Sequence, residues 1–340
     1  MHYIIFDLEW NQADKKQNED PKLPFEIIEI GAIKLNENFE KIGEFSRLIR
    51  PSVYHTMHAI TQDIIHISMS ELKREQTFTP VMRYFLKWCG EECVYGTWGS
   101  LDLTELQRNM DYYHFPPLSD GPLTYLDVQK LYALVYEPED DKKRRSLKNA
   151  VEQLGITQDI PFHRAFADAY YTAKVLQRIS AEPSAQQLLK RVSYDVYRIP
   201  KTRKQEVHII FDTYAKYISR EFEDKQAAME DREIASTKCY ICHKNCRKKL
   251  RWFTPNGRHY YALACCNKHG YIKGKIRMKK TEGDKVYVVK TLKLIDEEQA
   301  KTVQEKQEHA REIRRQHRRA KHEQKAHEKN ADAGMQGKAL

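Results

Sequence analysis

Short apolar runs separated by polar loops predict that the first half of the chain folds as an α/β domain. Three of these runs indicate strands that follow one another as an antiparallel meander: Tyr3–Leu8, Phe25–Leu35 and Phe39–Ile49. Gly31, inside the second run, predicts a close approach by another part of the backbone. The pattern then alternates between helix and strand, with predicted elements over Thr79–Trp88, Val94–Trp98 and Leu103–Tyr113. This alternation predicts a sheet covered by helices.

The pattern changes after residue 180, which divides the chain into regions. Helices are predicted over Ser146–Leu154 and Ala165–Ile179, and the first domain is expected to end near residue 180. Residues 181–236 have mostly helical spacing of their apolar positions, which predicts a helical connector. Residues 237–296 read as a compact β module with a turn at Pro255–Gly257. Residues 297–340 are expected to form a charged helix or a disordered tail.

Charge is divided unevenly between these regions. The 340 residues carry a net charge of +10, of which residues 1–180 contribute −6 and residues 181–340 contribute +16. A basic region of this kind is typical of proteins that bind nucleic acid or another polyanion, although a solvated basic helix would give the same count. No apolar run reaches 18 residues, and Asp7 and Glu9 interrupt the N-terminal apolar stretch. We therefore expect no membrane span, no signal peptide and a cytoplasmic location.

Two carboxylates stand on the first predicted strand. Asp7 and Glu9 are two positions apart, so their side chains project from the same face of the strand. Apolar residues surround them and indicate a central strand, where unpaired carboxylates are costly unless a cation lies beside them. We interpret the pair as ligands of a divalent metal ion, the alternative being a solvent-exposed strand face.

Three further residues extend this acidic set. Asp102 follows the strand at Val94–Trp98 and lies near the start of a helix, where a role as N-cap would also explain it. His163 precedes Asp168 by five positions, in the loop that enters the long helix. This spacing lets an imidazole lie beside a metal-binding carboxylate, although a purely structural pairing of the two residues is the alternative.

Together these residues resemble the motifs of the DEDDh family of 3′-to-5′ exonucleases. The Asp-x-Glu motif of that family is similar to Asp7 and Glu9 in IIFDLEW, and its second aspartate is similar to Asp102 in TWGSLD. Its third motif is similar to His163 and Asp168 in HRAFADA. The segments FEIIEIGAI and HAIT also resemble family positions, and TWGSLD is similar to the branch that trims RNA 3′ ends. The resemblance covers roughly residues 1–180, and it departs from the usual Leu-Thr-Gly-Ile at residues 59–62.

The resemblance implies a ribonuclease-H-like fold, a mixed sheet flanked by helices, and a two-metal-ion mechanism. Four carboxylates hold two Mg²⁺ or Mn²⁺ ions about 4 Å apart, one activating a water and the other stabilising the leaving 3′ oxygen. For this sequence the resemblance implies that Asp7 would bridge both ions and that Glu9, Asp102 and Asp168 would complete their shells. By the same resemblance, His163 would take a proton from the attacking water as general base.

Five of the seven cysteines cluster between residues 239 and 266, and the odd total argues against a disulfide framework. A C-x2-C pair and a C-x2-H pair flank a predicted hairpin, as in zinc-ribbon-like modules. The expected ligands of one structural Zn²⁺ are Cys239, Cys242, Cys266 and His269. Cys246 or Cys265 would be able to replace one of them, and buried or incidental cysteines are the alternative.

Basic residues interleaved with aromatic ones surround this cysteine cluster. The basic residues are Arg247, Lys248, Lys249, Arg251, Arg258, Lys268, Lys273, Lys275, Arg277, Lys279 and Lys280, and the aromatic ones are Trp252, Phe253, Tyr260, Tyr261 and Tyr271. The mixture predicts contacts to a nucleic-acid backbone together with base stacking. Alternatively, the aromatic residues form the core of the module and the charges are solvated.

These features predict a metal-dependent 3′-to-5′ exonuclease that acts on single-stranded nucleic acid, RNA favoured over DNA, with a basic C-terminal module that holds the strand. Two other functions stay open. One is a non-catalytic nucleic-acid-binding protein on a nuclease fold, and the other is a DNA proofreading exonuclease. The expected partner is nucleic acid and not a membrane, and the sequence leaves the oligomeric state open.

Overall fold

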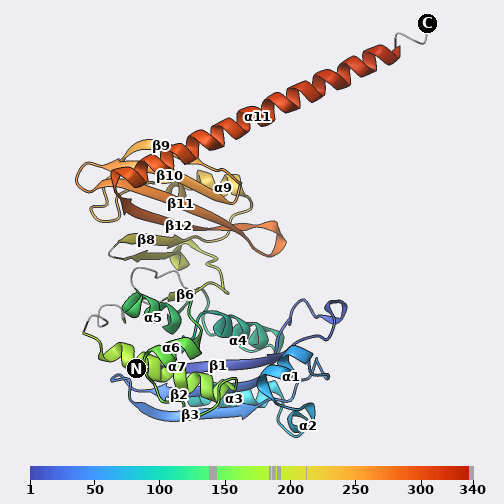
Figure 1. Ribbon diagram of the computed structural model, residues 1–340, viewed down its shortest axis with the longest axis vertical. Coiled ribbons are helices and arrows are strands. Elements are labelled where there is room, and N and C mark those ends of the chain that lie inside the picture. The colour runs from blue at the N-terminus through green and yellow to red at the C-terminus, as the bar shows by residue number, and fades with distance from the viewer. Residues whose placement is uncertain (138–143, 184, 186–188, 190–192, 212, 337–340) are drawn as a thin grey trace. The chain divides into compact units, whose positions relative to one another are not determined.

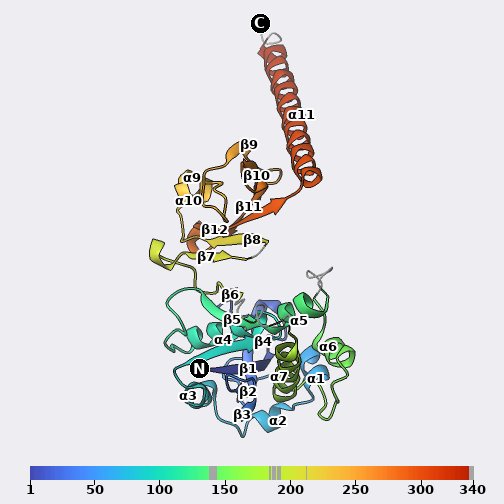
Figure 2. The same ribbon diagram turned by 90° about the vertical axis from the view of Figure 1, so that its left-hand side faces the viewer.

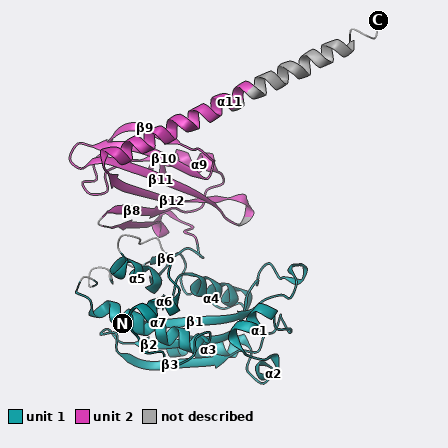
Figure 3. Ribbon diagram, in the orientation of Figure 1, with its two compact units in different colours: residues 1–198 teal, residues 199–340 magenta. Residues whose placement is uncertain are grey.

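The chain folds into two compact units in a computed structural model that describes residues 1–137, 144–183, 185, 189, 193–211 and 213–336. Unit 1 comprises Met1–Arg198 and unit 2 comprises Ile199–Leu340 (Figure 3). No helix among the described residues combines the length and the apolar character needed to cross a lipid bilayer.

Unit 1 is built around a six-stranded mixed sheet with the order β3-β2-β1-β4-β5-β6 (Figure 1). Its strands are β1 (His2–Asn11), β2 (Glu26–Leu35), β3 (Lys41–Leu48), β4 (Cys93–Thr97), β5 (Leu123–Asp127) and β6 (Ser193–Asp195). Strands β1, β2 and β3 form the predicted antiparallel meander, and β4 and β5 continue the sheet in parallel from β1. The antiparallel β6 closes the other edge.

Helices cover both faces of this sheet. They are α1 (Ala59–Ile65), α2 (Met69–Leu72), α3 (Phe78–Cys89), α4 (Leu101–Tyr112), α5 (Val128–Tyr136), α6 (Leu147–Gln153) and α7 (Ala165–Ala181), with a 3-10 turn η1 (Lys16–Asn18). Alternation along β1 sends Ile4, Phe6 and Leu8 into a core with α3 and α4. Ile5 points to the opposite core, which α5, α6 and α7 cover (Figure 2). The predicted mixed sheet flanked by helices is therefore confirmed.

The first unit ends at Arg198 instead of near residue 180. Strand β6 extends it, because Ser193–Asp195 pairs with β5 along the edge of the sheet. Asp195 is buried there and accepts hydrogen bonds from Gln107 Nε2 at 2.6 Å and Thr104 Oγ1 at 3.2 Å. A three-residue strand that pairs with a distant partner leaves no periodic pattern of its own, so the sequence did not indicate it.

The prediction of a helical connector over residues 181–236 is wrong. Beyond β6 and a 3-10 turn η3 (Arg203–Gln205), this stretch contains β7 (Val207–Ile210) and β8 (Tyr214–Ile218). Its only helices among the described residues from 193 to 236 are the short α9 (Lys225–Glu230) and α10 (Arg232–Ala235). The apolar positions are spaced three or four apart and fit a helix locally, but β8 pairs with β12, far away in the sequence, and that pairing decides the conformation.

Unit 2 contains a six-stranded antiparallel sheet with the order β7-β8-β12-β11-β10-β9. The remaining elements are β9 (Arg247–Phe253), β10 (His259–Cys266), β11 (Gly270–Lys280), η4 (Glu282–Asp284), β12 (Val286–Ile295) and α11 (Glu297–Gln336). The predicted β module of residues 237–296 is thus part of a larger sheet. Residues 297–340 were expected to form a charged helix or a disordered tail, and the structure shows the helix, α11, up to Gln336. Residues 337–340 lie outside the described part.

Each face of the second sheet has its own cover. On one face, α9 and α10 pack over a cluster that includes Ile276 and Val288. On the other face, the first turns of α11 place Ala300 and Val303 against Leu263 of β10 (Figure 1).

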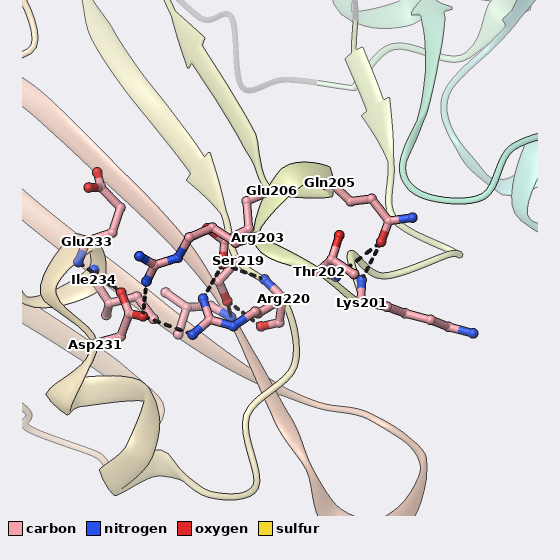
Figure 4. A network of polar contacts seen from close by, with 11 residues as sticks. Lys201, Thr202, Arg203, Gln205, Glu206, Ser219, Arg220, Asp231, Glu233 and Ile234 are labelled. Carbon is pink, nitrogen blue, oxygen red and sulfur yellow. Dashed lines mark hydrogen bonds and ion pairs between the residues drawn. The ribbon is translucent and has the colours of Figure 1, made fainter.

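A polar network ties the start of unit 2 to its sheet (Figure 4). Arg220 donates to Glu206 at 2.6 Å and to Asp231 at 3.1 Å, and Arg203 donates to the same aspartate at 2.8 Å. Asp231 also caps α10 by accepting from the backbone of Glu233. These bonds hold the segment that precedes β7 next to α10.

Candidate active site

The acidic residues of β1 face helix α7. Because Ile4, Phe6 and Leu8 occupy one side of β1, Asp7 and Glu9 project from the other side, where α7 lies. One ligand oxygen from each of Asp7, Glu9 and Asp168 lies within 4.8 Å of the other two. Residues 161 positions apart in the sequence are thereby brought into one cluster, which we call the carboxylate cluster.

Gly31 allows this approach. A Cβ atom at Gly31 of β2 would lie 2.1 Å from the backbone nitrogen of Phe166 and 2.2 Å from the carbonyl carbon of Ala165. The first turn of α7 therefore rests directly on β2, and Asp168 belongs to that turn. The close backbone approach predicted at Gly31 is confirmed.

Asp102 lies beside the cluster and outside it. It is the second residue of α4 and is buried, whereas Ser100 is the N-cap, so the alternative role of Asp102 as an N-cap is wrong. The backbone N–H groups of Asp102 and of Leu8 on β1 lower the pKa of its carboxyl, opposing the effect of burial. After burial, the negative charge of Asp102 raises the pKa of Asp7 more than any other charge does, which connects the two residues.

Burial and mutual repulsion raise the pKa of every carboxyl group here. For Asp7, loss of hydration and the charges of Asp102, Asp168, Glu9 and Glu29 raise the pKa well above its usual range. Burial and the charges of Asp168, Glu29 and Asp102 raise the pKa of Glu9 to about 8. Burial raises the pKa of Asp102 to about 7 and that of Asp168 to about 6. Without a cation, this site resists holding all its charges at neutral pH.

His163 lies at the entrance to α7 with an exposed side chain. Its backbone has φ +68°, in the left-handed region, just before the N-cap residue Arg164. Burial raises the pKa of the Asp168 carboxyl, and the nearby His163 opposes this effect by lowering that pKa. The structure therefore places the predicted base beside a member of the carboxylate cluster.

Two residues that lie beside the cluster were missed from the sequence. Glu29 of β2 is buried and pairs in register with Glu9, and Arg164 donates to it through Nε at 3.0 Å and one terminal nitrogen at 3.0 Å. Arg164 also lowers the pKa of Glu9, opposing the effect of burial. A signal was present, because a glutamate inside the apolar run FEIIEIGAI needs a buried partner. The ion pair with Glu29 therefore fixes Arg164, the residue directly after His163.

The carboxylate cluster fits divalent cations. Atom Oδ1 of Asp168 is buried and has no hydrogen-bond partner among the described residues, so this oxygen is available as a ligand. Several convergent carboxylate oxygens are hard ligands of the kind that Mg²⁺ and Mn²⁺ prefer. A positive ion would also relieve the repulsion that raises these pKa values.

A second candidate metal site lies in unit 2. Ligand atoms of Cys239, Cys242, Cys266 and His269 all lie within 4.8 Å of one another. Cys239 Sγ is 3.4 Å from His269 Nδ1, and Cys242 Sγ is 3.6 Å from Cys266 Sγ. Backbone N–H groups of Lys268 and His269 lower the pKa of Cys266 to about 6, which favours the thiolate form that binds metals.

The two alternative ligands do not join this group. Cys246 directs its sulfur to the carbonyl oxygen of Lys244 at 3.7 Å, and burial raises its pKa to about 11. Cys265 is next to Cys266 on β10 and therefore points to the opposite face of the sheet. The four-residue cluster thus contains the ligand set that the sequence spacing favoured.

The aromatic residues near the cysteines lie inside unit 2. Phe253 and Tyr261 are buried in the cluster under α11, and Tyr271 packs against it. Trp252 and Tyr260 pack against the opposite cluster. The alternative in which these rings form the core of the module therefore describes them better than base stacking does. The basic residues are left to account for any contact with a polyanion.

The match to a known protein family falls in unit 1. A sequence model of the exonuclease family RNase T matches residues 4–176. No curated protein matches the chain. Among solved structures, the nuclease domain of 3′hExo, described as a DEDDh family member and bound to rAMP, is 20% identical with a TM-score of 0.46, covering 56% of this chain and 96% of that one. E. coli Exonuclease I in complex with a dA16 oligonucleotide is 15% identical with a TM-score of 0.44, covering 56% and 43%. The Mg²⁺- and Mn²⁺-bound form of S. pombe Pop2p is 15% identical with a TM-score of 0.41, covering 54% and 84%.

Proposed function

This chain belongs to the RNase T family of exonucleases, and from that premise we propose that it removes nucleotides from the 3′ end of single-stranded nucleic acid, with RNA favoured. Membership confirms the exonuclease resemblance of residues 1–180 and makes the protein a metal-dependent nuclease. The 3′-to-5′ direction and the preference for RNA rest on the motifs, above all on the similarity of TWGSLD to RNA-trimming relatives. We also propose a cytoplasmic location, because a thiolate-rich zinc site suits a reducing compartment.

The observation that carries the proposal is the carboxylate cluster with its unpartnered oxygen on Asp168. Asp7, Glu9, Asp102 and Asp168 would hold two Mg²⁺ or Mn²⁺ ions. When bound, the ions supply positive charge that activates water and stabilises the leaving 3′ oxygen during phosphodiester hydrolysis.

The protein residues do the rest of the chemistry. His163 is exposed at the rim of the cluster, and in this proposal it takes a proton from the attacking water as general base. Glu29 accepts hydrogen bonds from the Arg164 side chain and from the backbone N–H of Ala165, which fixes the chain directly after His163. The packing of α7 on β2 at Gly31 keeps the base and the acidic ligands in the same place.

Digestion of 5′-labelled RNA and DNA oligonucleotides tests the proposal. Wild-type protein with Mg²⁺ or Mn²⁺ is expected to shorten the RNA stepwise from its 3′ end and to leave it intact without these ions. Asp7→Ala and Asp168→Ala are expected to abolish cleavage, whereas Asp14→Ala, in the exposed loop after β1, keeps it. Binding without cleavage by wild-type protein would favour a non-catalytic nucleic-acid-binding protein, and a clear preference for DNA would favour proofreading.

We further propose that Cys239, Cys242, Cys266 and His269 hold one structural Zn²⁺. Three thiolates and one imidazole within a small cluster form a donor set typical of structural zinc sites. The site lies where the loop after α10 meets the turn between β10 and β11, so the ion would join two parts of unit 2 that local sequence does not connect.

A further inference from the structure

Strand β11 presents a row of cations on one face of the second sheet. Lys273, Lys275 and Arg277 alternate with residues that point the other way, of which Ile272 and Ile276 are fully buried. Two further cations complete the set, Lys293 from β12 and Lys306 from α11. We call these five residues the cationic face.

Four of the five cations lie close enough to act on one another, and Arg277 continues their row along β11. Lys293 stands directly opposite Lys273 in the register of β11 and β12, a like-charge pair that destabilises a sheet. Lys306 Nζ lies 4.1 Å from the centre of the Tyr261 ring, and Lys273 Nζ lies 6.0 Å from the same centre. Burial and the charges of Lys306, Lys275 and Lys293 lower the pKa of Lys273.

Among the residues that the structure describes, the charge of the cationic face has no ion-pair partner. Within the described residues, none of the five cations forms an ion pair with an aspartate or glutamate, whereas Lys280 and Lys285 elsewhere in unit 2 both do. Collecting unpaired cations on one surface opposes folding, so a structural role does not explain the arrangement. An anionic ligand that bridges them would remove this repulsion.

The form of the face suits the phosphates of an extended strand. Alternate residues on a β-strand are about 6.8 Å apart, which gives a regular line of positive charges along β11. Because the neighbouring aromatic rings are packed into the hydrophobic clusters, they are not free to stack on bases. Contacts would then be made to phosphates alone, which predicts binding that depends strongly on salt and little on base sequence.

We propose that the cationic face binds the phosphate backbone of single-stranded nucleic acid. The choice of nucleic acid among polyanions rests on the proposed function of unit 1, whose acidic site and net charge of −6 over residues 1–180 give it little attraction of its own for such a strand. The face thereby supplies affinity that the nuclease unit lacks.

Charge reversal on the face tests this proposal in the full-length protein. Lys275 and Arg277 are both exposed, so Lys275→Glu combined with Arg277→Glu is compatible with the fold. The matched control combines Lys201→Glu with Lys204→Glu, which changes the net charge equally at exposed positions before β7. Binding to a long labelled oligonucleotide is measured at several salt concentrations without Mg²⁺ or Mn²⁺, so that no strand is cut.

The face variant is expected to bind about 10-fold more weakly than the control, and its slope of log affinity against log salt is expected to fall by about 1.4, corresponding to two lost phosphate contacts. Equal affinities and slopes in the two variants would overturn the proposal. So would a face variant that loses binding to phosphatidylserine vesicles while binding oligonucleotides as the control does, because the ligand would then be a lipid surface. Failure of the proposed nuclease function is seen separately, as wild-type protein that binds the strand and does not cut it with Mg²⁺ or Mn²⁺.

Discussion

At the scale of single residues, the carboxylate cluster makes stability depend on pH. The pKa of Glu9 rises from its ordinary value of 4.5 to about 8, chiefly because burial removes its hydration. The folded protein therefore keeps a proton that the unfolded chain releases above pH 4.5. Because the folded state binds more protons, the contribution of Glu9 to the free energy of unfolding is fully present below pH 4.5. It is lost as the pH rises through about 8.

The decrease in stability with rising pH is expected to disappear in part in Glu9→Gln, which keeps the shape of the side chain and removes its charge. In protein freed of Mg²⁺ and Mn²⁺, we expect the melting temperature of the variant to exceed that of wild type by a margin that grows from pH 5 to pH 8. Added Mg²⁺ or Mn²⁺ is expected to stabilise wild type more than the variant. A margin that shrinks or stays constant over this pH range would contradict the prediction.

His163 carries a second prediction at the residue scale. His163→Ala is expected to lower the cleavage rate by about 100-fold and to flatten the acid side of the pH–rate profile, because the general base is lost while the metal ligands remain. The control is His114→Ala, an exposed histidine that also has a positive φ, at 59° compared with 68° for His163. An unchanged pH profile in His163→Ala would exclude the residue as the base.

At the scale of elements, the contact between β2 and α7 decides whether the site exists. Asp7 and Glu9 belong to a strand and Asp168 belongs to a helix, and only the close packing of α7 on β2 brings them together. Gly31 stands at that contact, where a side chain would meet backbone atoms that have no freedom to move aside. The helix would have to shift away from the sheet to make room.

We therefore predict that Gly31→Ala damages both stability and activity. The free energy of unfolding is expected to fall by about 1–3 kcal/mol through overpacking. The cleavage rate, measured well below the melting temperature, is expected to fall as well, because Asp168 moves away from Asp7. Gly43→Ala on β3 is the matched control, since its Cβ would meet Trp88 at 3.5 Å, an ordinary contact. Equal behaviour of the two variants in both measurements would contradict this role for Gly31.

At the scale of the whole molecule, each unit has its own candidate metal site with different donor atoms. Oxygen donors in unit 1 suit Mg²⁺ or Mn²⁺, and thiolates with an imidazole in unit 2 suit Zn²⁺. The two kinds of metal are therefore expected to serve different purposes, chemistry in unit 1 and stability in unit 2.

Purified protein is expected to contain about one Zn²⁺ per chain, since the four ligands form one cluster. Cys239→Ser combined with Cys242→Ser should lose the metal and make unit 2 sensitive to proteolysis, while cleavage of short oligonucleotides by unit 1 persists. Cys246→Ser combined with Cys265→Ser changes two cysteines outside the cluster and should retain the zinc. Metal analysis that finds no zinc in folded wild-type protein would refute the site.

The sequence alone determined the features that depend on residues close together in the chain. Alternating apolar residues indicated β1, β2 and β4, and the motifs around Asp7, Asp102 and His163 indicated the exonuclease family, because motif residues are held at short, fixed spacings. The four-residue cysteine and histidine set followed in the same way from two pairs with metal-ligand spacing. Gly31 also predicted a close backbone approach, although the sequence did not indicate which helix makes it.

Tertiary structure decided what depends on residues far apart in the chain. Strand β8 is extended because it pairs with β12, and β6 joins unit 1 because it pairs with β5, and neither pairing leaves a local pattern. The partnership of Glu29 with Arg164 spans 135 positions, and the cationic face combines two strands with a helix. Local spacing determines which chemistry a segment is able to perform, whereas long-range packing determines which segments meet to perform it.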